Sequence, residues 1–316
     1  MPPAPVIVNQ LGALVGARLV AHPVRPVVVD QPPGMPPWQL PSEADVLVTS
    51  PCGWRQAPAS APPGWPHGLT WIQTTSVGID FYPRWMARGV TLSCGRGIAA
   101  GPIAEYVLAA ILGFEKRLGA VAARAPAEWR QSVLGTLDGR TIGLVGYGAI
   151  GRAVARRAVA FGARVLAVRR GAWDPAEPDA LPAASLEALV AAADHLVLAV
   201  PQTAETRRLV DAALLARAKP GQHLVNVARG GLVDHDALLA ALDDGRLGGA
   251  TLDVTEPEPL PAGHPLYGHP KVLLTPHVAW TDGGHEERIA AKILSNLTRF
   301  ARGALLDDVV DPLRGY

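Results

Sequence analysis

Three side chains of different chemistry follow three successive apolar stretches in the last third of the chain. Arg229 lies in NVARGGLVD, Glu258 in LDVTEPEPLP and His277 in LLTPHVAW. A guanidinium can hold the carboxylate of a 2-oxo acid and polarise its carbonyl, while an imidazolium can protonate the carbonyl oxygen near neutral pH. A carboxylate on the other ring nitrogen would orient the imidazole and favour its protonated form. The trio therefore predicts reduction of a 2-oxo acid to a 2-hydroxy acid, without a metal.

Such a reaction needs a hydride donor, and a glycine-rich turn upstream is suited to bind one. In GLVGYGAIGRA, Gly146, Gly148 and Gly151 match G-x-G-x-x-G between an expected strand at 141–145 and an expected helix. The glycines permit a tight turn and a close approach of backbone to pyrophosphate, while the helix N-terminus presents free N–H groups to the anion. We expect a dinucleotide at this turn, with the remaining loop contacts made by Tyr147, Ala149 and Ile150.

The second strand of this unit ends in two cations where an acid is the common residue. NAD-binding versions normally carry Asp or Glu about 20 residues after the turn, to accept a hydrogen bond from the ribose 2′-OH. Arg169 stands there, followed by Arg170. A guanidinium can hold a 2′-phosphate that a carboxylate would repel. The sequence therefore predicts a preference for NADP(H), with NAD(H) still possible.

These residues require a doubly wound sheet to bring them together. Apolar stretches alternate with helix-like segments, as expected for a mostly parallel sheet whose ligands bind outside the carboxyl ends of the strands. The expected strands are 141–145, 164–168, 195–200, 223–227, 249–254 and 271–275.

The first 95 residues contain five more short apolar stretches separated by Pro and Gly, which predict a second α/β unit with weakly indicated helices. A long helix should begin near residue 99, with Pro102 in its first turn. The final helical stretch is expected to pack back on the first domain. We therefore expect a discontinuous substrate domain, 1–97 and 286–316, and a dinucleotide domain, 98–285, as two Rossmann-like or flavodoxin-like folds.

Composition limits the other possibilities. A chain of 316 residues with 49% hydrophobic residues suits two domains, and a net charge of +1 gives no broad basic field for nucleic acid. We expect no leader peptide and no membrane span, hence a cytoplasmic protein with a small-molecule partner. The two cysteines provide neither a disulfide framework nor a metal set.

The motifs resemble the D-isomer-specific 2-hydroxyacid dehydrogenase family over nearly the whole chain, most strongly over residues 138–280. The segments that carry the resemblance are GLVGYGAIGR, VPQTAETRRLV, LVNVARGGLVD, LDVTEPEPLP and TPHVAW. The last two, with the arginines at 169 and 170, are most similar to glyoxylate/hydroxypyruvate reductases. The resemblance implies the same Arg–Glu–His trio, a cofactor domain inserted into a substrate domain, an active site in the cleft between them, and a homodimer.

The resemblance also implies roles for residues whose function their chemistry alone does not indicate. Asp253 would bind the nicotinamide amide, and loops around Cys52, Gly53 and Gly78 would hold the substrate carboxylate together with Arg229 and His277. Trp129 resembles a tryptophan that some relatives send into the neighbouring subunit; core packing is the alternative. After His277 and the hydrophobic residue that follows it, the family often has Gly and a small residue, whereas Ala279 and Trp280 stand here. Whether Trp280 shapes the pocket or covers the nicotinamide stays open. Further cofactor contacts are expected at Pro201, Thr206, Val227, Ala228 and His277.

Two other functions stay open at this stage. An NAD-dependent 3-phosphoglycerate dehydrogenase would need extra cations near the first-domain loops, where Arg55 is one of few. A dinucleotide-sensing corepressor could retain the whole trio. Formate dehydrogenases share the fold, but their His pairs with Gln, so Glu258 argues against them.

Overall fold

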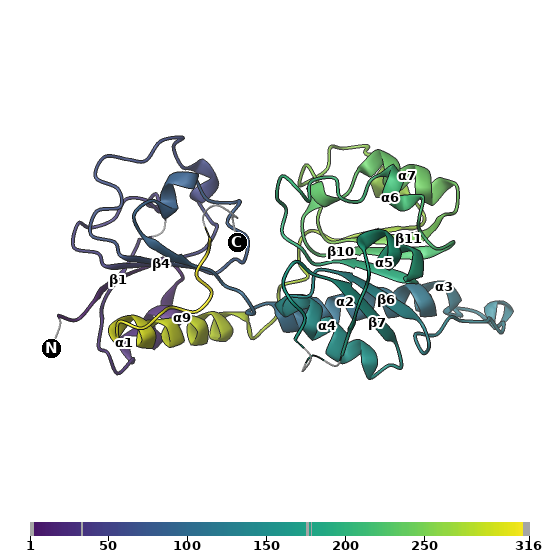
Figure 1. Cartoon of the computed structure of the whole chain (residues 1–316), viewed down its shortest axis with the longest axis horizontal. Coiled ribbons are helices and arrows are strands. Elements are labelled where there is room, and N and C mark those ends of the chain that lie inside the picture. Colours follow the sequence, from purple (N-terminus) through teal and green to yellow (C-terminus); the bar gives the residue numbers. More distant parts are fainter. Residues whose placement is uncertain (1–2, 33, 175–176, 178, 312–316) are drawn as a thin grey trace. The chain divides into compact units, whose positions relative to one another are not determined.

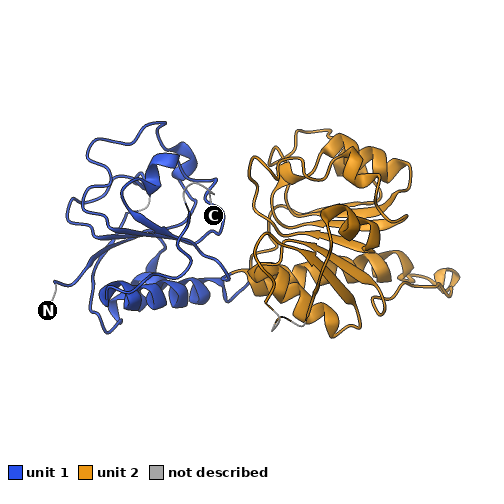
Figure 2. Ribbon diagram, viewed as in Figure 1, with its two compact units in different colours: residues 1–98, 282–316 blue, residues 99–281 orange. Residues whose placement is uncertain are grey.

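The structure, a computed structural model, describes residues 3–32, 34–174, 177 and 179–311 (Figure 1). It divides into two compact units (Figure 2): unit 1 comprises residues 1–98 and 282–316, and unit 2 comprises 99–281. The boundaries expected from the sequence, after residues 97 and 285, lie one and four residues from these divisions. Residues 1–2 and 312–316, at the ends of the expected first domain, lie outside the described residues.

Unit 1 is built on a parallel five-stranded sheet of order β2-β1-β3-β4-β5, the flavodoxin-like order. All five apolar stretches expected in this region are strands. They are β1 Val6–Asn9, β2 Val27–Asp30, β3 Val46–Thr49, β4 Trp71–Thr74 and β5 Thr91–Ser93. Alternate strand residues supply two apolar layers, because successive side chains point to opposite faces of a strand.

The two faces of this sheet are covered differently. Helices α1 (Ala13–Val20) and α9 (His285–Ala301) pack together against one face. The other face is covered by an aromatic cluster and by the short 3₁₀ turns η1 (Trp54–Gln56) and η2 (Arg84–Ala87). Proline recurs through the connection at 58–66, where it removes backbone donors and excludes regular helix. This explains why the sequence indicates helices only weakly here.

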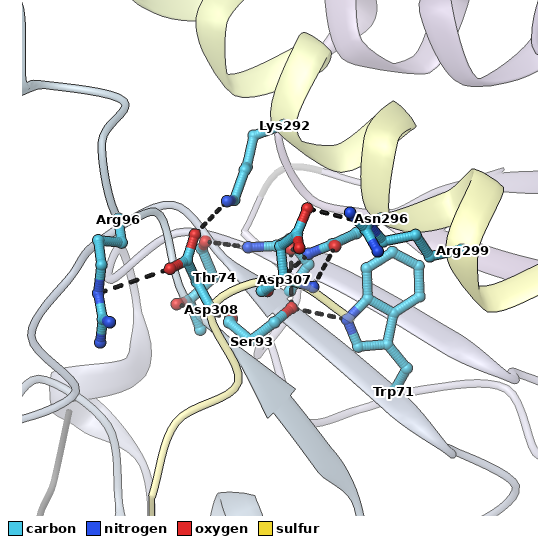
Figure 3. A network of polar contacts seen from close by, with 10 residues as sticks. Trp71, Thr74, Ser93, Arg96, Lys292, Asn296, Arg299, Asp307 and Asp308 are labelled. Atoms are coloured by element: carbon cyan, nitrogen blue, oxygen red, sulfur yellow. Dashed lines mark hydrogen bonds and ion pairs between the residues drawn. The ribbon is translucent and has the colours of Figure 1, made fainter. Parts of the chain in front are cut away.

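The C-terminal segment belongs to unit 1 through a buried polar network (Figure 3). The Asn296 side chain of α9 donates to Gln73 of β4 at 2.8 Å, and Ser93 of β5 donates to the same Gln73 oxygen at 2.7 Å. The Trp71 indole N–H donates to Ser93 at 2.8 Å. Beyond α9, Val310 N donates to the Leu92 carbonyl at 2.8 Å. The C-terminal segment is therefore joined to both strands at this edge, to β4 through Asn296 of α9 and to β5 through Val310 beyond the helix.

Unit 2 is a parallel seven-stranded sheet of order β12-β11-β10-β9-β6-β7-β8, which is the Rossmann order with one strand added. All six strands expected from the sequence are present, and the fold class is confirmed. The sequence does not indicate the seventh strand, β8, which has two residues, lies at the sheet edge and contains Pro182. The strands are β6 Thr141–Val145, β7 Arg164–Val168, β8 Leu181–Pro182, β9 His195–Leu198, β10 Gln222–Asn226, β11 Leu247–Leu252 and β12 Val272–Leu274.

Helices cover both faces of this sheet, as Figure 1 shows. Helices α2 (Ala100–Lys116) and α4 (Ala149–Val159) pack on one face. The opposite face is covered by α5 (Leu186–Ala192), α6 (Ala212–Leu215) and α7 (His235–Asp243). The shorter elements are α3 Leu118–Val121, η3 Pro126–Glu128, η4 Gly230–Leu232 and α8 Pro265–Gly268. Within the described residues, none of the helices combines the length and apolarity that a membrane crossing requires.

Two histidines are buried at the amino ends of adjacent strands in unit 2. His195 of β9 and His223 of β10 are in register, and the Phe114 ring stacks on His223 with centroids 4.4 Å apart. Burial lowers the pKa of His195 to about 4 and that of His223 to about 3, against an ordinary value of 6.5. Both imidazoles are therefore neutral in the folded protein at neutral pH.

This burial predicts a loss of stability in mild acid. Below about pH 6.5 the unfolded chain binds protons at these histidines that the folded chain does not, so the free energy of unfolding falls as pH falls. Each histidine contributes at most about 1.4 kcal/mol per pH unit. Urea unfolding at pH 7.5 and pH 5 measures the difference. His223→Gln should reduce the pH dependence, and an unchanged dependence in this variant would contradict the assignment.

Candidate active site

The sheet order of unit 2 brings the three candidate catalytic residues to one edge. Strands β10, β11 and β12 are parallel neighbours in which Asn226, Leu252 and Leu274 occupy one register line. Arg229 and His277 each follow this line by three residues, and Glu258 follows it by six. Neighbouring strands lie about 4.8 Å apart, so the ends of β10 and β12 are separated by roughly 10 Å. A small keto acid could fit between the Arg229 and His277 side chains across a separation of this size.

His277 and Glu258 form a direct pair. The imidazole Nδ1 lies 3.1 Å from Glu258 Oε2, and both side chains are partly exposed. Glu256, which lies two residues before Glu258 and is the other acid that could pair with His277, is instead paired with Arg207 at 2.9 Å. Because Glu258 binds Nδ1, the opposite ring nitrogen, Nε2, is the one that can face a substrate oxygen.

A buried carboxylate holds the turn that carries His277. Asp253 accepts backbone N–H bonds from Val278 and Ala279, both at 2.9 Å, and the Thr275 hydroxyl donates to it at 2.6 Å. The His277 N–H donates to the Asp253 carbonyl at 2.8 Å. His277 has a φ of +55°, a left-handed conformation that costs a non-glycine residue free energy unless its surroundings hold it. Asp253 is thus the main support of this turn.

Two further side chains contact the same turn: Tyr106, which the sequence does not identify as part of the site, and Trp280, to which it assigns no role. The Thr275 hydroxyl has one proton, which goes to Asp253, so the Tyr106 hydroxyl is the donor in its 2.6 Å contact with Thr275. Burial raises the pKa of Tyr106, which keeps this donor protonated. Trp280, whose role the sequence leaves undecided, donates its indole N–H to the His277 carbonyl at 2.8 Å. The imidazole therefore sits on a turn fixed from several directions.

The expected contact of Asp253 with the nicotinamide amide stays a prediction. An ionised carboxylate has about four acceptor positions, and hydrogen bonds from its own chain occupy three of them. One position remains for an amide N–H.

Arg229 is held at the end of β10 by its neighbours. The Asn226 amide donates to the Arg229 carbonyl at 2.9 Å, and the guanidinium Nη1 donates to the Ala228 carbonyl at 2.8 Å. A Cβ added to the next residue, Gly230, would lie 1.9 Å from the Thr255 carbonyl carbon. The backbone at Gly230 thus lies too close to the segment after β11 for any side chain at this position. This close approach fixes the backbone position from which the Arg229 side chain extends.

The glycine turn fits a dinucleotide pyrophosphate. A Cβ on Gly146, whose φ is +104°, would lie 2.6 Å from the Ala199 oxygen, and one on Gly151 would lie 2.4 Å from the Gly146 oxygen. A Cβ on Gly148 meets nothing within 4 Å. Gly148 is also the N-cap of α4, with no side-chain cap. The open space at Gly148 and the uncapped N–H groups at Ala149, Ile150 and Gly151 suit a bound phosphate.

The two arginines after β7 have different surroundings. Arg169, 21% exposed, donates to Glu177 at 2.8 Å, and its guanidinium lies 5.8 Å from the centre of the Trp173 ring. Arg170 contacts Glu205 at 3.4 Å, and both side chains are exposed. Position 169 itself carries no acid. The fold nevertheless brings the carboxylate of Glu177, eight residues further along the chain, into contact with Arg169.

The remaining expected cofactor residues lie at the same edge, because β6, β9 and β10 are neighbours. Thr206 donates its hydroxyl to the Pro201 carbonyl at 2.8 Å in the segment after β9. Val227 and Ala228 are buried directly after β10. The buried Tyr147 ring stacks on Trp173 with centroids 5.1 Å apart.

The expected substrate loops lie in unit 1, after adjacent strands. Thr49 of β3 and Thr74 of β4 are in register; Cys52 and Gly53 follow the first, and Gly78 follows the second. Gly53 has a φ of +79°, and Ser76 donates to the Gly78 carbonyl at 2.9 Å. Cys52 is exposed. Their contact with substrate stays a prediction.

Comparison with known proteins identifies the family. Residues 108–279 match the family described as "D-isomer specific 2-hydroxyacid dehydrogenase, NAD binding domain". Glyoxylate/hydroxypyruvate reductase B of Pectobacterium carotovorum is 36% identical over 76% of this chain and 78% of its own length. The (S)-sulfolactate dehydrogenase of Chromohalobacter salexigens is 42% identical over 62% of this chain, and the match spans 65% of that enzyme.

A solved structure gives the same result. The NADPH-dependent glyoxylate/hydroxypyruvate reductase of Sinorhizobium meliloti, in complex with NADP and sulfate, has a TM-score of 0.79 and 27% identity, covering 99% of this chain and 100% of that one. The chain belongs to the D-isomer specific 2-hydroxyacid dehydrogenase family and is an oxidoreductase of that class, as its motifs indicate. Its relatives include the glyoxylate/hydroxypyruvate reductase branch.

Replacing His277 tests its role as proton donor. We expect His277→Gln to lower turnover by roughly 10²–10⁴-fold, because general acid catalysis typically contributes this much, while NADPH affinity stays nearly unchanged. Steady-state kinetics and fluorescence titration with NADPH measure the two quantities. The same replacement at the exposed His67 of unit 1 is the control and should change neither. Near-normal turnover in His277→Gln would remove it as the donor.

Proposed function

We propose that this protein uses NADPH to reduce a short 2-oxo acid of the glyoxylate or hydroxypyruvate type to the D-2-hydroxy acid. The observation that carries the proposal is the 3.1 Å pairing of His277 with Glu258 at the sheet edge where Arg229 also lies. The named reductases among its relatives support the same substrate class. A cytoplasmic location stays a prediction from the sequence.

The side chains divide the reaction between them. When bound, the nicotinamide supplies the hydride that adds to the carbonyl carbon. Arg229 holds the substrate carboxylate and polarises the carbonyl with a guanidinium whose planar shape matches both groups. His277 gives its Nε2 proton to the carbonyl oxygen, and Glu258 on Nδ1 keeps the ring oriented and balances its positive charge.

The proposed preference for NADPH rests on the residues after β7. Arg169 follows the strand at the position where NAD-binding domains commonly carry an acid. The partly buried guanidinium is a stronger candidate for a 2′-phosphate than the exposed Arg170, because solvent screens an exposed charge. The NADP complex of the Sinorhizobium meliloti relative supports this choice. NAD(H) remains a second possible cofactor.

A second candidate substrate is a 2-oxo acid with an additional acidic group. The 42% identity to a sulfolactate dehydrogenase favours it. Unit 1 also has a surface pocket of about 620 Å³, lined by residues that follow Gly53 and Gly78 in the sequence. Its charged lining residues are Arg55, Arg84 and Asp80, two cations and one acid. Cations at such a pocket would suit a sulfonate or phosphate better than the uncharged tail of hydroxypyruvate.

One set of assays separates these substrates. We expect NADPH oxidation to be fastest with glyoxylate or hydroxypyruvate, slower with pyruvate and phenylpyruvate, and faster with NADPH than with NADH. Values of kcat/KM measured with each cofactor give the ranking. A clear advantage for sulfopyruvate or 3-phosphohydroxypyruvate would select the acidic-substrate alternative. Negligible turnover with every acid, with tight dinucleotide binding intact, would contradict the enzymatic proposal and favour a sensor.

We also propose that the protein is a homodimer. Leu118, Trp129 and Val133 are 68%, 86% and 92% exposed in the segment after α2, which is costly for large apolar side chains unless another chain covers them. Core packing of Trp129 within this chain, the alternative considered from the sequence, is wrong.

Sedimentation equilibrium tests the dimer. We expect a dimer at micromolar concentration, weakened when Trp129 and Val133 are both changed to Ser, because apolar area buried between the chains is lost. The control replaces Leu305, which is 90% exposed in unit 1, by Ser and should remain dimeric. A monomeric wild-type protein would contradict the proposal.

A further inference from the structure

A carboxylate joins two guanidiniums beside the expected adenosine end of the cofactor site. One oxygen of Glu177 accepts from Arg169 at 2.8 Å, and its other oxygen accepts from Nε of Arg152. The Glu177 side chain is only 15% exposed, so the bridge is largely withdrawn from water. Charge-assisted bonds of this kind are stronger than the ion pairs of an open surface.

The two arginines come from elements that frame the glycine turn. Arg152 lies in the first turn of α4, directly after Gly151, and its guanidinium lies 5.7 Å from the centre of the Tyr147 ring. Arg169 directly follows β7, the strand paired with β6, and its guanidinium lies over the Trp173 ring. The two rings stack at an interplanar angle of 29°. Both cations are therefore held against a stacked aromatic pair, with Glu177 between them.

The chemistry of this bridge affects the two dinucleotides in opposite ways. A 2′-phosphate that reaches Arg169 must compete with the Glu177 carboxylate for the guanidinium, and the two anions repel each other. A ribose 2′-OH carries no charge and can donate a hydrogen bond to the same carboxylate. Glu177 therefore opposes the phosphorylated cofactor and tolerates the unphosphorylated one.

We propose that Glu177 is a specificity-determining residue that lowers the preference for 2′-phosphorylated dinucleotides by competing for Arg169 and Arg152. This inference rests on the proposed function, in which Arg169 faces the 2′ position of the cofactor. The balance of one acid and two arginines, rather than Arg169 alone, then sets the ratio of NADPH to NADH affinity.

Binding of small adenosine nucleotides tests the proposal without turnover. Calorimetric titration compares adenosine 2′,5′-bisphosphate with adenosine 5′-monophosphate, which differ only in the 2′-phosphate. We expect Glu177→Gln to bind the bisphosphate about tenfold more tightly than wild type, with the monophosphate unchanged or slightly weaker. Unchanged or weaker bisphosphate binding in Glu177→Gln would overturn the proposal.

Two control variants separate local competition from other causes. Glu105→Gln removes the same charge from another arginine pair of unit 2, Glu105 with Arg157 at 3.4 Å, and should change either affinity less than twofold. Glu177→Asp keeps the carboxylate and should stay near the wild-type affinity. If Glu177→Asp tightens bisphosphate binding as much as Glu177→Gln does, a change in local structure rather than loss of charge is the cause, and the proposal fails.

A third variant distinguishes failure of this inference from failure of the cofactor assignment. Arg169→Asp should weaken bisphosphate binding at least tenfold, leave the monophosphate nearly unchanged, and improve the affinity for NADH relative to NADPH. If Arg169→Asp has no such effect, the assigned 2′-phosphate site is wrong. If it has the effect while Glu177→Gln does not tighten bisphosphate binding, only the role of Glu177 is wrong.

Discussion

The site depends on the buried carboxylate of Asp253. This group accepts two backbone N–H bonds and one hydroxyl bond from residues 275–279, and it thereby holds His277 in a left-handed backbone conformation. That conformation costs on the order of 1 kcal/mol or more for a residue with a side chain, and the charge-assisted bonds offset it. The result is an imidazole whose position is set by the sheet, because Asp253 itself directly follows β11.

The parallel sheet supplies the rest of the arrangement. Strands β10, β11 and β12 end at one edge of the sheet. The segments that follow them carry the Arg229 guanidinium, the Glu258 carboxylate and the His277 imidazole, respectively. The glycine turn and Arg169 follow β6 and β7 at the same edge of the same sheet. The expected cofactor residues and the proposed proton donor are thus positioned by a single framework, as the proposed transfer of a hydride and a proton to one carbonyl would require.

The features that sequence alone predicts are those encoded locally. Short apolar stretches identify all six principal strands of unit 2, and the glycine spacing and the trio lie in compact motifs. Contacts across the chain are not encoded in this way. Tyr106 contacts Thr275, which lies 169 residues away in the sequence. The Glu177 carboxylate contacts Arg169 from eight residues further along the chain, so the lack of an acid at position 169 does not mean that no acid lies beside Arg169. The two-residue β8 and the 3₁₀ turns of unit 1 lack the periodicity that reveals longer elements.

The most direct test of this account is a crystal structure with NADP and oxamate, an unreactive analogue of a 2-oxo acid. The measured quantities are the distances from one oxamate molecule to the Arg229 guanidinium and to His277 Nε2. We predict that both side chains lie within about 3 Å of oxygen atoms of that molecule, with Glu258 still on Nδ1. A complex in which Arg229 and His277 contact no common ligand would contradict the account.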